Sequence, residues 1–500
     1  MRKLLWILPF LLCFMASSGA VARSFSGPRL AFPGAEGFGA TAKGGRGGDV
    51  YHVTNLGDSG AGSLREGIET AVGARTIVFE VGGVVDLQSP LWVSAERLTV
   101  AGQTAPGGIG LRGYPMVVAG ARDLVLRYLR LRPGDLNAQA ARGRPGQGNA
   151  DLPGDAADAL SIFDSRRVIV DHISASWGMD ETLSVTSSRA VTVQHSIISE
   201  SLNDSFHPEG LHGYGSLLRG VGGRGFTFFG NLYAHHALRS PAVGGEQTPQ
   251  PGEERRGLDI EFVNNVVYDW GVISSHTVED LARMRVNYQA NVHIAGPTTL
   301  CKICVFTVVD PSPADRLSVH HAGNWLDAQP NGVFDPEPAS DPSFFGVMEI
   351  VEEPFRFGHR SLAALPALRA YDRVLREAGA SLPRDDVDRR VIRQVIEQSG
   401  VIIDSQEQVG GWPAVPPPRP PPMDLDRDGM ADAWECRMGL DPEEPEDRNR
   451  FDLSRRYTNL EIYLHYLVSP DRGGLELRRA EQHRPGRRGG GRANCRAGSR

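Results

Sequence analysis

Short segments in which apolar and polar side chains alternate recur along most of the chain. They occupy residues 98–100, 124–126, 168–170, 191–193, 226–228, 260–262, 286–288 and 317–319. Successive segments start roughly 23 to 44 residues apart, which is the repeat range of solenoids and related arrays. One such segment is too short to bury its own apolar side, so each repeat must pack against its neighbours. The pattern therefore predicts a stack of coils.

An asparagine follows three of these segments at a fixed distance. Asn231, Asn265 and Asn291 each stand five residues after a segment start, at 226, 260 and 286. At a bend shared by neighbouring coils, an Asn side chain can hydrogen-bond its own turn and the next coil, and Asn tolerates left-handed backbone angles. Helical patterns are scarce and no propeller-blade signature occurs, so we expect an all-β parallel β-helix over residues 31–335.

The pattern changes after residue 335. Residues 362–379 and 385–400 have helical periodicity, and the second segment places Val387, Val391 and Val395 on one face together with Ile392. A Pro-rich stretch and an acidic stretch follow, and the chain ends in an Arg- and Gly-rich tail. We therefore expect a short helical extension (336–411), a stiff linker (412–422), a small acidic module (423–467) and a basic, disordered tail (468–500).

The first residues resemble an export signal. Arg2 and Lys3 precede an apolar stretch over residues 4–15, and Ala20-Val-Ala22 provides a small-residue cleavage site. A membrane anchor is the alternative, but the apolar stretch is short for a bilayer. We expect residues 1–22 to be a signal peptide and the mature chain to be secreted, either extracellular or periplasmic. The net charge is mildly acidic at −7. We expect a monomer that binds neither nucleic acid nor membrane.

Four cysteines remain after such a signal peptide is removed: Cys301, Cys304, Cys436 and Cys495. Their pairing cannot be deduced from the sequence, although an oxidising compartment permits disulfides. The CxxC spacing of Cys301 and Cys304 favours a local or structural disulfide over a redox or zinc site, because no second ligand pair accompanies it.

Residues 424–435 match the twelve-residue calcium loop D-x-[DN]-x-[DN]-G-x5-E in full. The match assigns carboxylate ligands at alternate positions, a glycine for the sharp turn, a backbone carbonyl, an acid acting through water and a bidentate glutamate. The residues in these roles are Asp424, Asp426, Asp428, Gly429, Met430, Asp432 and Glu435. The loop predicts an EF-hand-like Ca²⁺ site, and residues 457–466 suit its partner helix.

A second group of acids lies on the middle repeats. It comprises Asp155, Asp158, Asp171, Asp180 and Glu181. Carboxylates gathered on adjacent coils repel one another unless a cation neutralises them, and Ca²⁺ is the natural hard cation for oxygen ligands outside the cell. Neighbouring side chains point to opposite faces of an extended backbone, so only one of Asp180 and Glu181 can be a direct ligand if the backbone is extended there. A surface cluster without a metal is the alternative.

Several motifs in order resemble those of the pectate lyases of polysaccharide lyase family 1. They lie at residues 31–39 (AFPGAEGFG), 44–48, 53–60, 99–107 (TVAGQTAPG), 171–181 (DHISASWGMDE), 212–216 (HGYGS) and 410–413. The resemblance covers about residues 32–296 strongly and the helical extension weakly. Some secreted members also end in a D-x-D-x-D-G module.

The resemblance implies a right-handed β-helix and Ca²⁺-dependent β-elimination of α-1,4-polygalacturonate, the pectate of plant cell walls. Arg239 in Arg239-Ser-Pro241 matches the family's R-x-P motif and would be the base that removes the C5 proton, with Asp158, Asp180 and Glu181 as metal ligands. Because arginine is held to be permanently charged, stabilisation of the enolate is the alternative role of Arg239.

The sequence departs from the family pattern at three places. Gly244 stands where a second arginine is frequent, Ser184 where an aspartate is frequent, and Glu209 lies in the region where a lysine is usual. His207, His212 or Arg219 could supply the missing positive charge, and His212 and Arg219 are our candidate substrate-binding residues.

Two other functions remain open from the sequence. The first is a lyase for methylated pectin or another uronan. The second is a non-catalytic carbohydrate-binding β-helix, which Arg239 argues against. A hydrolase is disfavoured, because β-helix polygalacturonases need paired carboxylates at a defined spacing and their set of sequence blocks is not found.

Overall fold

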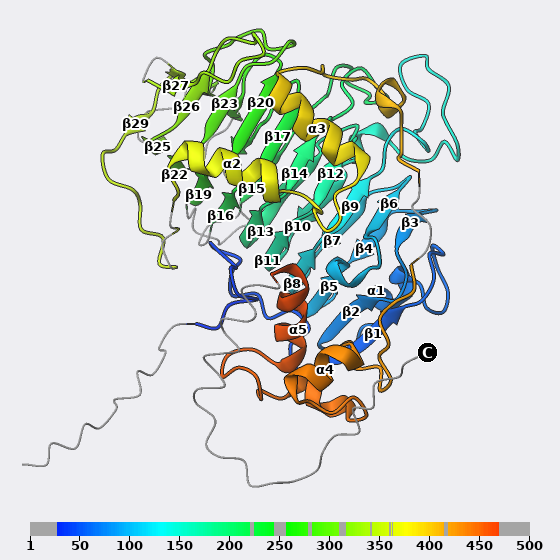
Figure 1. Cartoon of the computed structure of the whole chain (residues 1–500). Coiled ribbons are helices and arrows are strands. Elements are labelled where there is room, and N and C mark those ends of the chain that lie inside the picture. The colour runs from blue at the N-terminus through cyan, green and yellow to red at the C-terminus, as the bar shows by residue number, and fades with distance from the viewer. Residues whose placement is uncertain are drawn as a thin grey trace, which may run out of the picture.

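The computed structural model describes residues 28–220, 225–244, 257–278, 283–309, 317–340, 343–359, 362, 364–414 and 419–469. Its strands are stacked coil upon coil in parallel register, and they form the three faces of a right-handed parallel β-helix (Figure 1). The predicted fold class is confirmed. The predicted signal peptide (1–22) and the tail beyond Ser469 lie outside the described residues. Within the described residues, no helix is both long and apolar enough to span a bilayer.

Face 1 carries the strands that follow the longest loops. Its strands are β4 (Leu91–Val93), β7 (Met116–Ala119), β10 (Leu160–Phe163), β13 (Leu183–Gln194), β15 (Leu217–Gly220), β18 (Ala242–Gly244), β21 (Ser275–Thr277), β24 (Phe306–Thr307) and β28 (Phe344–Phe345). Strand β13 continues around the corner and joins face 2 as well.

Face 2 contains most of the alternating segments found in the sequence. Its strands are β1 (Asp49–Val53), β2 (Arg75–Phe79), β5 (Leu98–Ala101), β8 (Arg122–Arg127), β11 (Arg166–Asp171), the second half of β13, β16 (Phe226–Phe229), β19 (Leu258–Val263), β22 (Met284–Gln289), β25 (Leu317–Ala322) and β29 (Glu349–Ile350).

Face 3 closes each coil. Its parallel strands are β3 (Gly83–Asp86), β6 (Ile109–Arg112), β9 (Leu129–Arg132), β12 (Ser174–Ser176), β14 (Ile197–Ser199), β17 (Leu232–His236), β20 (Val266–Trp270), β23 (Val292–Ile294) and β26 (Trp325–Asp327), and β27 (Glu337–Pro338) runs antiparallel at the edge. Each loop that leads from face 3 back to face 1 emerges on one side of the molecule. These loops carry the candidate residues of the active site.

The asparagines form a ladder at the corner between face 2 and face 3. Asn231 N donates to Asn265 Oδ1 at 2.9 Å, Asn265 N to Asn291 Oδ1 at 2.9 Å, and Asn291 N to Asn324 Oδ1 at 3.0 Å. The predicted structural role is confirmed, and Asn324 extends the ladder by one coil. The left-handed residue at each bend is the one before the ladder position, as Asn264 shows with φ 57°.

Two helices cover face 3 (Figure 1). Helix α2 (Ala367–Glu377) begins after Pro366, and α3 (Asp386–Glu397) is capped by Asp385, whose side chain accepts from Asp388 N. Val374, Val391 and Val395 pack in one cluster with strand residues such as Leu232 and Val266. Both predicted helices are present, and the first begins later than its periodicity suggested because a proline at position 366 favours the start of a helix.

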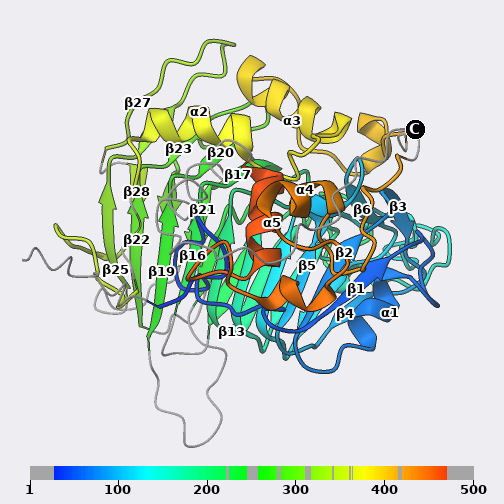
Figure 2. The same cartoon turned by 60° about the horizontal axis from the view of Figure 1, so that its bottom comes forward.

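The acidic module packs against the first coils of the β-helix. It consists of α4 (Asp432–Met438), the short 3-10 helix η6 (Pro445–Asn449) and α5 (Asn459–Val468). Met430, Trp434 and Leu460 belong to a core that also includes Ala101 at the end of β5 and borders Val50 of β1. Figure 2 shows α4 and α5 beside β1, β2 and β5, as does Figure 1. The remaining short helices are α1 (Leu64–Glu69), η1 (Gly102–Thr104), η2 (Gly154–Ala156) and η5 (Gln406–Val409).

Candidate active site and metal sites

Three carboxylates meet where adjacent coils enter face 1. Asp158 precedes β10, while Asp180 and Glu181 precede β13 on the next coil, and one oxygen from each lies within 4.8 Å of the others. We expected only one of Asp180 and Glu181 to be a direct ligand if the backbone were extended there, and that condition is not met. The chain is not an extended strand at Asp180, which lies in a bend, so the strand rule of alternating side chains does not apply to the pair.

Asp158 is a buried member of this acid triad and accepts several hydrogen bonds. Its carboxylate accepts from Ser161 Oγ at 2.7 Å, from Glu181 N at 3.0 Å and from the Ser184 hydroxyl. Ser184, which departs from the acid of the family pattern, therefore hydrogen-bonds a candidate ligand. The hydroxyl contributes a hydrogen bond and adds no negative charge, which leaves three carboxylates in the group.

The triad carries more negative charge than its burial tolerates. Burial, with the neighbouring carboxylates adding to it, raises the pKa of Asp158 and of Asp180 to about 7 each. Burial and Asp180 raise the pKa of Glu181 to about 8. Two buried carboxylates and a partly exposed one that repel one another in this way suit a hard divalent cation such as Ca²⁺, which would restore the ionised forms.

The two other acids of the sequence group do not join the triad. Asp155 is exposed beside it, in η2. Asp171 lies at the end of β11 on face 2, where Arg127 Nη2 forms a 2.7 Å ion pair with it. Burial acts to raise the pKa of Asp171, but His172 and Arg127 outweigh burial and hold that pKa well below its usual range. Asp171 is therefore neutralised by side chains and needs no metal.

Arg239 faces the triad from the next coil but one. It stands before β18, its Nη1 donates to the Glu181 carboxylate, and its guanidinium lies 4.2 Å from the centroid of the Tyr214 ring. The side chain of Arg239 is 24% exposed, whereas that of Glu181 is 5% exposed. The guanidinium is therefore held between an acid and an aromatic ring, with part of it open to solvent.

Tyr214 is the residue that sequence reasoning missed. It lies within the HGYGS motif, two positions after His212, and its ring also packs 4.0 Å from that of His212. The motif indicated a functional segment, but periodicity alone could not show that its tyrosine lies under Arg239.

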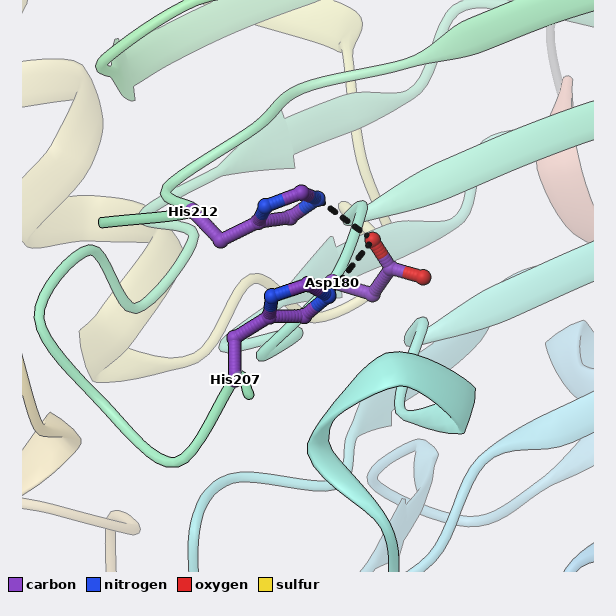
Figure 3. Close-up of side chains that lie close together, drawn as sticks. All are labelled: Asp180, His207 and His212. Atoms are coloured by element: carbon purple, nitrogen blue, oxygen red, sulfur yellow. Dashed lines mark ion pairs between the residues drawn. The ribbon is translucent and has the colours of Figure 1, made fainter. Parts of the chain in front are cut away.

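Two stacked histidines hold Asp180 (Figure 3). The rings of His207 and His212 lie 3.5 Å apart, and Asp180 Oδ1 lies 2.8 Å from His212 Nε2 and 3.7 Å from His207 Nε2. Burial is the largest cause that lowers the pKa of each histidine to about 4, so both rings are neutral at neutral pH. His207 Nδ1 accepts from Glu209 N at 3.2 Å, which leaves Nε2 as the protonated nitrogen that faces Asp180.

This arrangement bears on the nature of the metal. A metal-ligating histidine donates from its other ring nitrogen to a partner, whereas the other nitrogen of His207 accepts. His207 therefore turns a protonated Nε2 toward Asp180 without the ring arrangement of a metal ligand, and the oxygen triad remains the candidate metal site. His212, predicted to bind substrate, is placed beside the triad.

Arg219 lies on β15 in register with Gly244 of β18. A Cβ atom built on Gly244 would come within 2.9 Å of Arg219 Cγ and 3.1 Å of Arg219 Nε. Gly244 thus leaves room for the Arg219 side chain. Arg219 lies beside the position where the family pattern frequently has a second arginine and this chain has Gly244.

The calcium loop of the sequence brings its acids together. Asp424, Asp426 and Asp428 each offer an oxygen within 4.8 Å of the others, and Asp428, Glu435 and Asp447 do the same. Burial is the largest cause that raises the pKa of Asp426 to about 6, of Asp428 to about 8 and of Glu435 to about 9. Asp447, on η6, is outside the twelve-residue motif and was not predicted.

The other loop residues stabilise its turns. Gly429 has φ 92°, a left-handed value that the sharp turn requires. Asp432 accepts from Leu425 N at 2.8 Å through Oδ1, and Met430 N donates to Asp428 Oδ1 at 2.8 Å. The donor set is oxygen-rich and buried, so it fits Ca²⁺ as well. Cys301 and Cys304 form a disulfide, as their spacing favoured.

Comparison with known proteins gives consistent relatives, although no family model matches the chain. Probable pectate lyase C of Emericella nidulans is 36% identical over 444 residues, which cover 88% of this chain and 93% of that protein. Probable pectate lyase C of Aspergillus fumigatus is 35% identical over 467 residues, covering 92% and 98%. Among solved structures, jun a 1, the major allergen from cedar pollen, has a TM-score of 0.51 and 18% identity, covers 69% of this chain and 92% of that one, and supports the fold alone.

Proposed function

The chain belongs to the pectate lyases, which are polysaccharide lyases, and from this membership we propose that it is a secreted, Ca²⁺-dependent enzyme that cleaves α-1,4-polygalacturonate by β-elimination to unsaturated oligogalacturonates. The observation that carries the proposal is the meeting of Arg239 with the triad of Asp158, Asp180 and Glu181. The arrangement places a part-exposed cation beside three acids that could hold a metal ion, and a metal ion so placed can assist the abstraction of a proton from a bound substrate.

The proposed reaction removes the proton at C5 of a galacturonate. The electron pair of the C5–H bond becomes the C4–C5 double bond, the C4–O bond breaks, and the released oxygen ends with a proton. Asp158, Asp180 and Glu181 would hold the Ca²⁺ ion, which would supply positive charge near the substrate carboxylate and so acidify the C5 proton. Each bond broken gives one fragment with an unsaturated non-reducing end and one fragment with an ordinary reducing end.

The chain's own residues would divide the remaining work. Tyr214 and Glu181 hold the guanidinium of Arg239 in one place, so that it faces the C5 proton and the developing enolate. We propose Arg239 as the base, with enolate stabilisation as the alternative role. His207 and His212 hold Asp180, and Ser184 holds Asp158, so both ligands are oriented before substrate arrives.

Arg219 and His212 would contact the acidic polymer. Arg219 lies on the strand that follows the His212 segment, and a guanidinium can bind a uronate carboxylate by a two-pronged contact. We propose the loop of residues 424–435 as a second calcium site with a structural role.

A product assay tests the proposal. Polygalacturonate, methylated pectin and another uronan are incubated with the protein, with and without a chelator, and the absorbance of the new double bond is followed. We expect a rise on polygalacturonate that the chelator abolishes. Saturated products would indicate hydrolysis, a rise only on methylated pectin would change the substrate, and binding without any product would support the non-catalytic alternative.

A further inference from the structure

Asp447 brings a carboxylate to the calcium loop from outside it. It lies on η6, twelve positions after Glu435, and one of its oxygens is within 4.8 Å of Asp428 and Glu435 oxygens. Its Oδ2 accepts from Asp441 N at 3.2 Å, while its Oδ1 has no hydrogen-bond partner among the described residues. Asp447 is 2% exposed, so water does not compensate for the missing partner.

Glu435 provides a second, independent sign of a bound cation. It is fully buried at 0% exposure, and neither of its carboxylate oxygens has a hydrogen-bond partner among the described residues. Asp428 is also 0% exposed, and its Oδ2 has no hydrogen-bond partner among the described residues. Leaving buried carboxylates unpaired is costly, whereas a Ca²⁺ ion takes six to eight oxygen ligands and would satisfy all of them.

The segments that carry these ligands also form the contact with the β-helix. The carbonyl of Arg427, between two loop acids, lies 3.0 Å from Nε2 of His52 on β1, and the Arg427 side chain forms a 3.1 Å ion pair with Glu80 after β2. On η6, Asn449 Nδ2 donates to Gly48 O at 3.2 Å. Both ligand segments therefore touch the first coil directly.

Gly429 shows how closely the loop approaches that coil. A Cβ atom on this glycine would lie 3.2 Å from Val50 Cγ1 and 3.5 Å from Val78 Cγ1. A change in the loop backbone, such as one that follows repulsion among its acids, would therefore be transmitted to β1 and β2.

We propose that Asp447 supplies a further ligand to the Ca²⁺ ion of the 424–435 loop, and that the filled site fastens the C-terminal module to strands β1 and β2 of the β-helix. The ion joins η6 to the loop, and both then present a fixed surface to the first coil. The proposal deepens the structural role given to the loop site, and it does not depend on lyase activity.

Metal titration of the full chain tests the ligand role. Terbium is a Ca²⁺ substitute whose luminescence can be excited through Trp434 in the loop. It is titrated into the Asp180→Asn variant, in which metal binding by the acid triad of the candidate active site is weakened. We expect Asp447→Asn to weaken terbium binding about tenfold or more. Loss of an outer-shell partner of a metal already has an effect of this size, and loss of a direct ligand should have at least the same effect. Ca²⁺ should displace the terbium in parallel.

Glu446→Gln is the matched control, because Glu446 lies on the same short helix and its side chain is 69% exposed. It should bind terbium as the background does, and Glu435→Gln should lose the signal. Equal affinities for Asp447→Asn and Glu446→Gln would overturn the ligand role of Asp447.

Hydrogen exchange tests the fastening. Ca²⁺ should slow the exchange of amides in β1 and β2 in the wild type, and much less in Asp447→Asn, while β22 on a remote coil responds equally in both. If Asp447→Asn does not fold, His52→Gln replaces it: terbium should still bind, and the protection of β1 should fall. Protection of the module without protection of β1 would overturn the fastening. Neither readout uses activity, so failure of the proposed lyase reaction would be seen separately.

Discussion

At the scale of single residues, the candidate active site depends on how Arg239 is held. Its guanidinium has the Glu181 carboxylate on one side and the face of the Tyr214 ring on the other. A planar, delocalised cation suits both contacts, whereas the compact ammonium of lysine does not match the ring face and the carboxylate together. The geometry of the site is therefore specific to arginine even though the charge is not.

Arg239→Lys is expected to lower kcat for polygalacturonate about 100-fold or more and to change KM less. A factor of about 100 is the lower bound for the loss of a positioned proton-transfer group. Arg285→Lys is the control, because Arg285 forms an ion pair with Asp259 on face 2 at 2.8 Å and is 45% exposed. The measurement is the initial rate of unsaturated product, with circular dichroism to verify folding. Full activity of Arg239→Lys would contradict the catalytic assignment.

The members of the two metal sites could be predicted only in part. Residue types and spacing identified Asp158, Asp180 and Glu181. The alternation of side chains on a strand left open whether both Asp180 and Glu181 could face the same site, because the sequence did not show that the chain bends at Asp180. The EF-hand pattern identified its own loop but not Asp447, since a motif contains no information about which distant carboxylate folds back onto it.

His293 makes a prediction on pH. It is buried on β23, its ring nitrogens face Ser274 Oγ and Tyr288 OH, and burial lowers its pKa to about 3. In the unfolded chain a histidine has a pKa of about 6.5. Between these two values the unfolded state binds a proton that the folded state does not, so the free energy of unfolding falls as pH falls.

His293→Gln should therefore reduce the dependence of stability on pH below about 6.5, by up to about 1.36 kcal/mol per pH unit for one proton. Urea unfolding of wild type and variant between about pH 7 and 5, at constant Ca²⁺, measures the difference. All other titrating groups are shared, so parallel stability profiles would show that His293 is protonated in the folded state as well.

At the scale of elements, the asparagine ladder joins successive coils through buried hydrogen bonds. Asn265 accepts from Asn231 N through Oδ1 and donates to Phe228 O through Nδ2, so one side chain satisfies backbone groups of the preceding coil. The repeat spacing predicted this role. It could not predict most strands of face 3, because strands as short as β12 (Ser174–Ser176) have no readable alternation.

Asn265→Ala should lower the free energy of unfolding by about 2 kcal/mol or more, because it leaves the Asn231 N–H and the Phe228 carbonyl without partners at about 1–3 kcal/mol each. Asn331→Ala is the comparison, since Asn331 Oδ1 accepts from Val333 N in an exposed turn. Denaturant unfolding monitored by tryptophan fluorescence gives both values. Similar losses of unfolding free energy in the two variants would show that the ladder asparagine contributes no more to stability than an asparagine in an exposed turn.

At the scale of the whole molecule, the C-terminal module is part of the enzyme's fold. Arg46 of the N-terminal region pairs with Glu461 of α5 at 2.6 Å, and Ala101 is fully buried under the core of the module that the sequence predicted after a stiff linker. The composition of the linker gave no sign of this contact, because docking depends on the apolar face of a folded module. The candidate active site, by contrast, lies on the loops that enter face 1 near β10, β13 and β18.

Removal of residues 423–500 should therefore separate stability from activity. The exposed apolar surface around Val50 and Ala101 should lower Tm by more than about 2 °C, the shift expected from a loss of only 1 kcal/mol in a large domain. The kcat of the folded fraction should change little, because the acid triad and Arg239 do not touch the module. Scanning calorimetry and the product assay measure the two quantities. An unchanged Tm would mean that the module docks without stabilising the β-helix, and an inactive but folded product would mean that it shapes the active site.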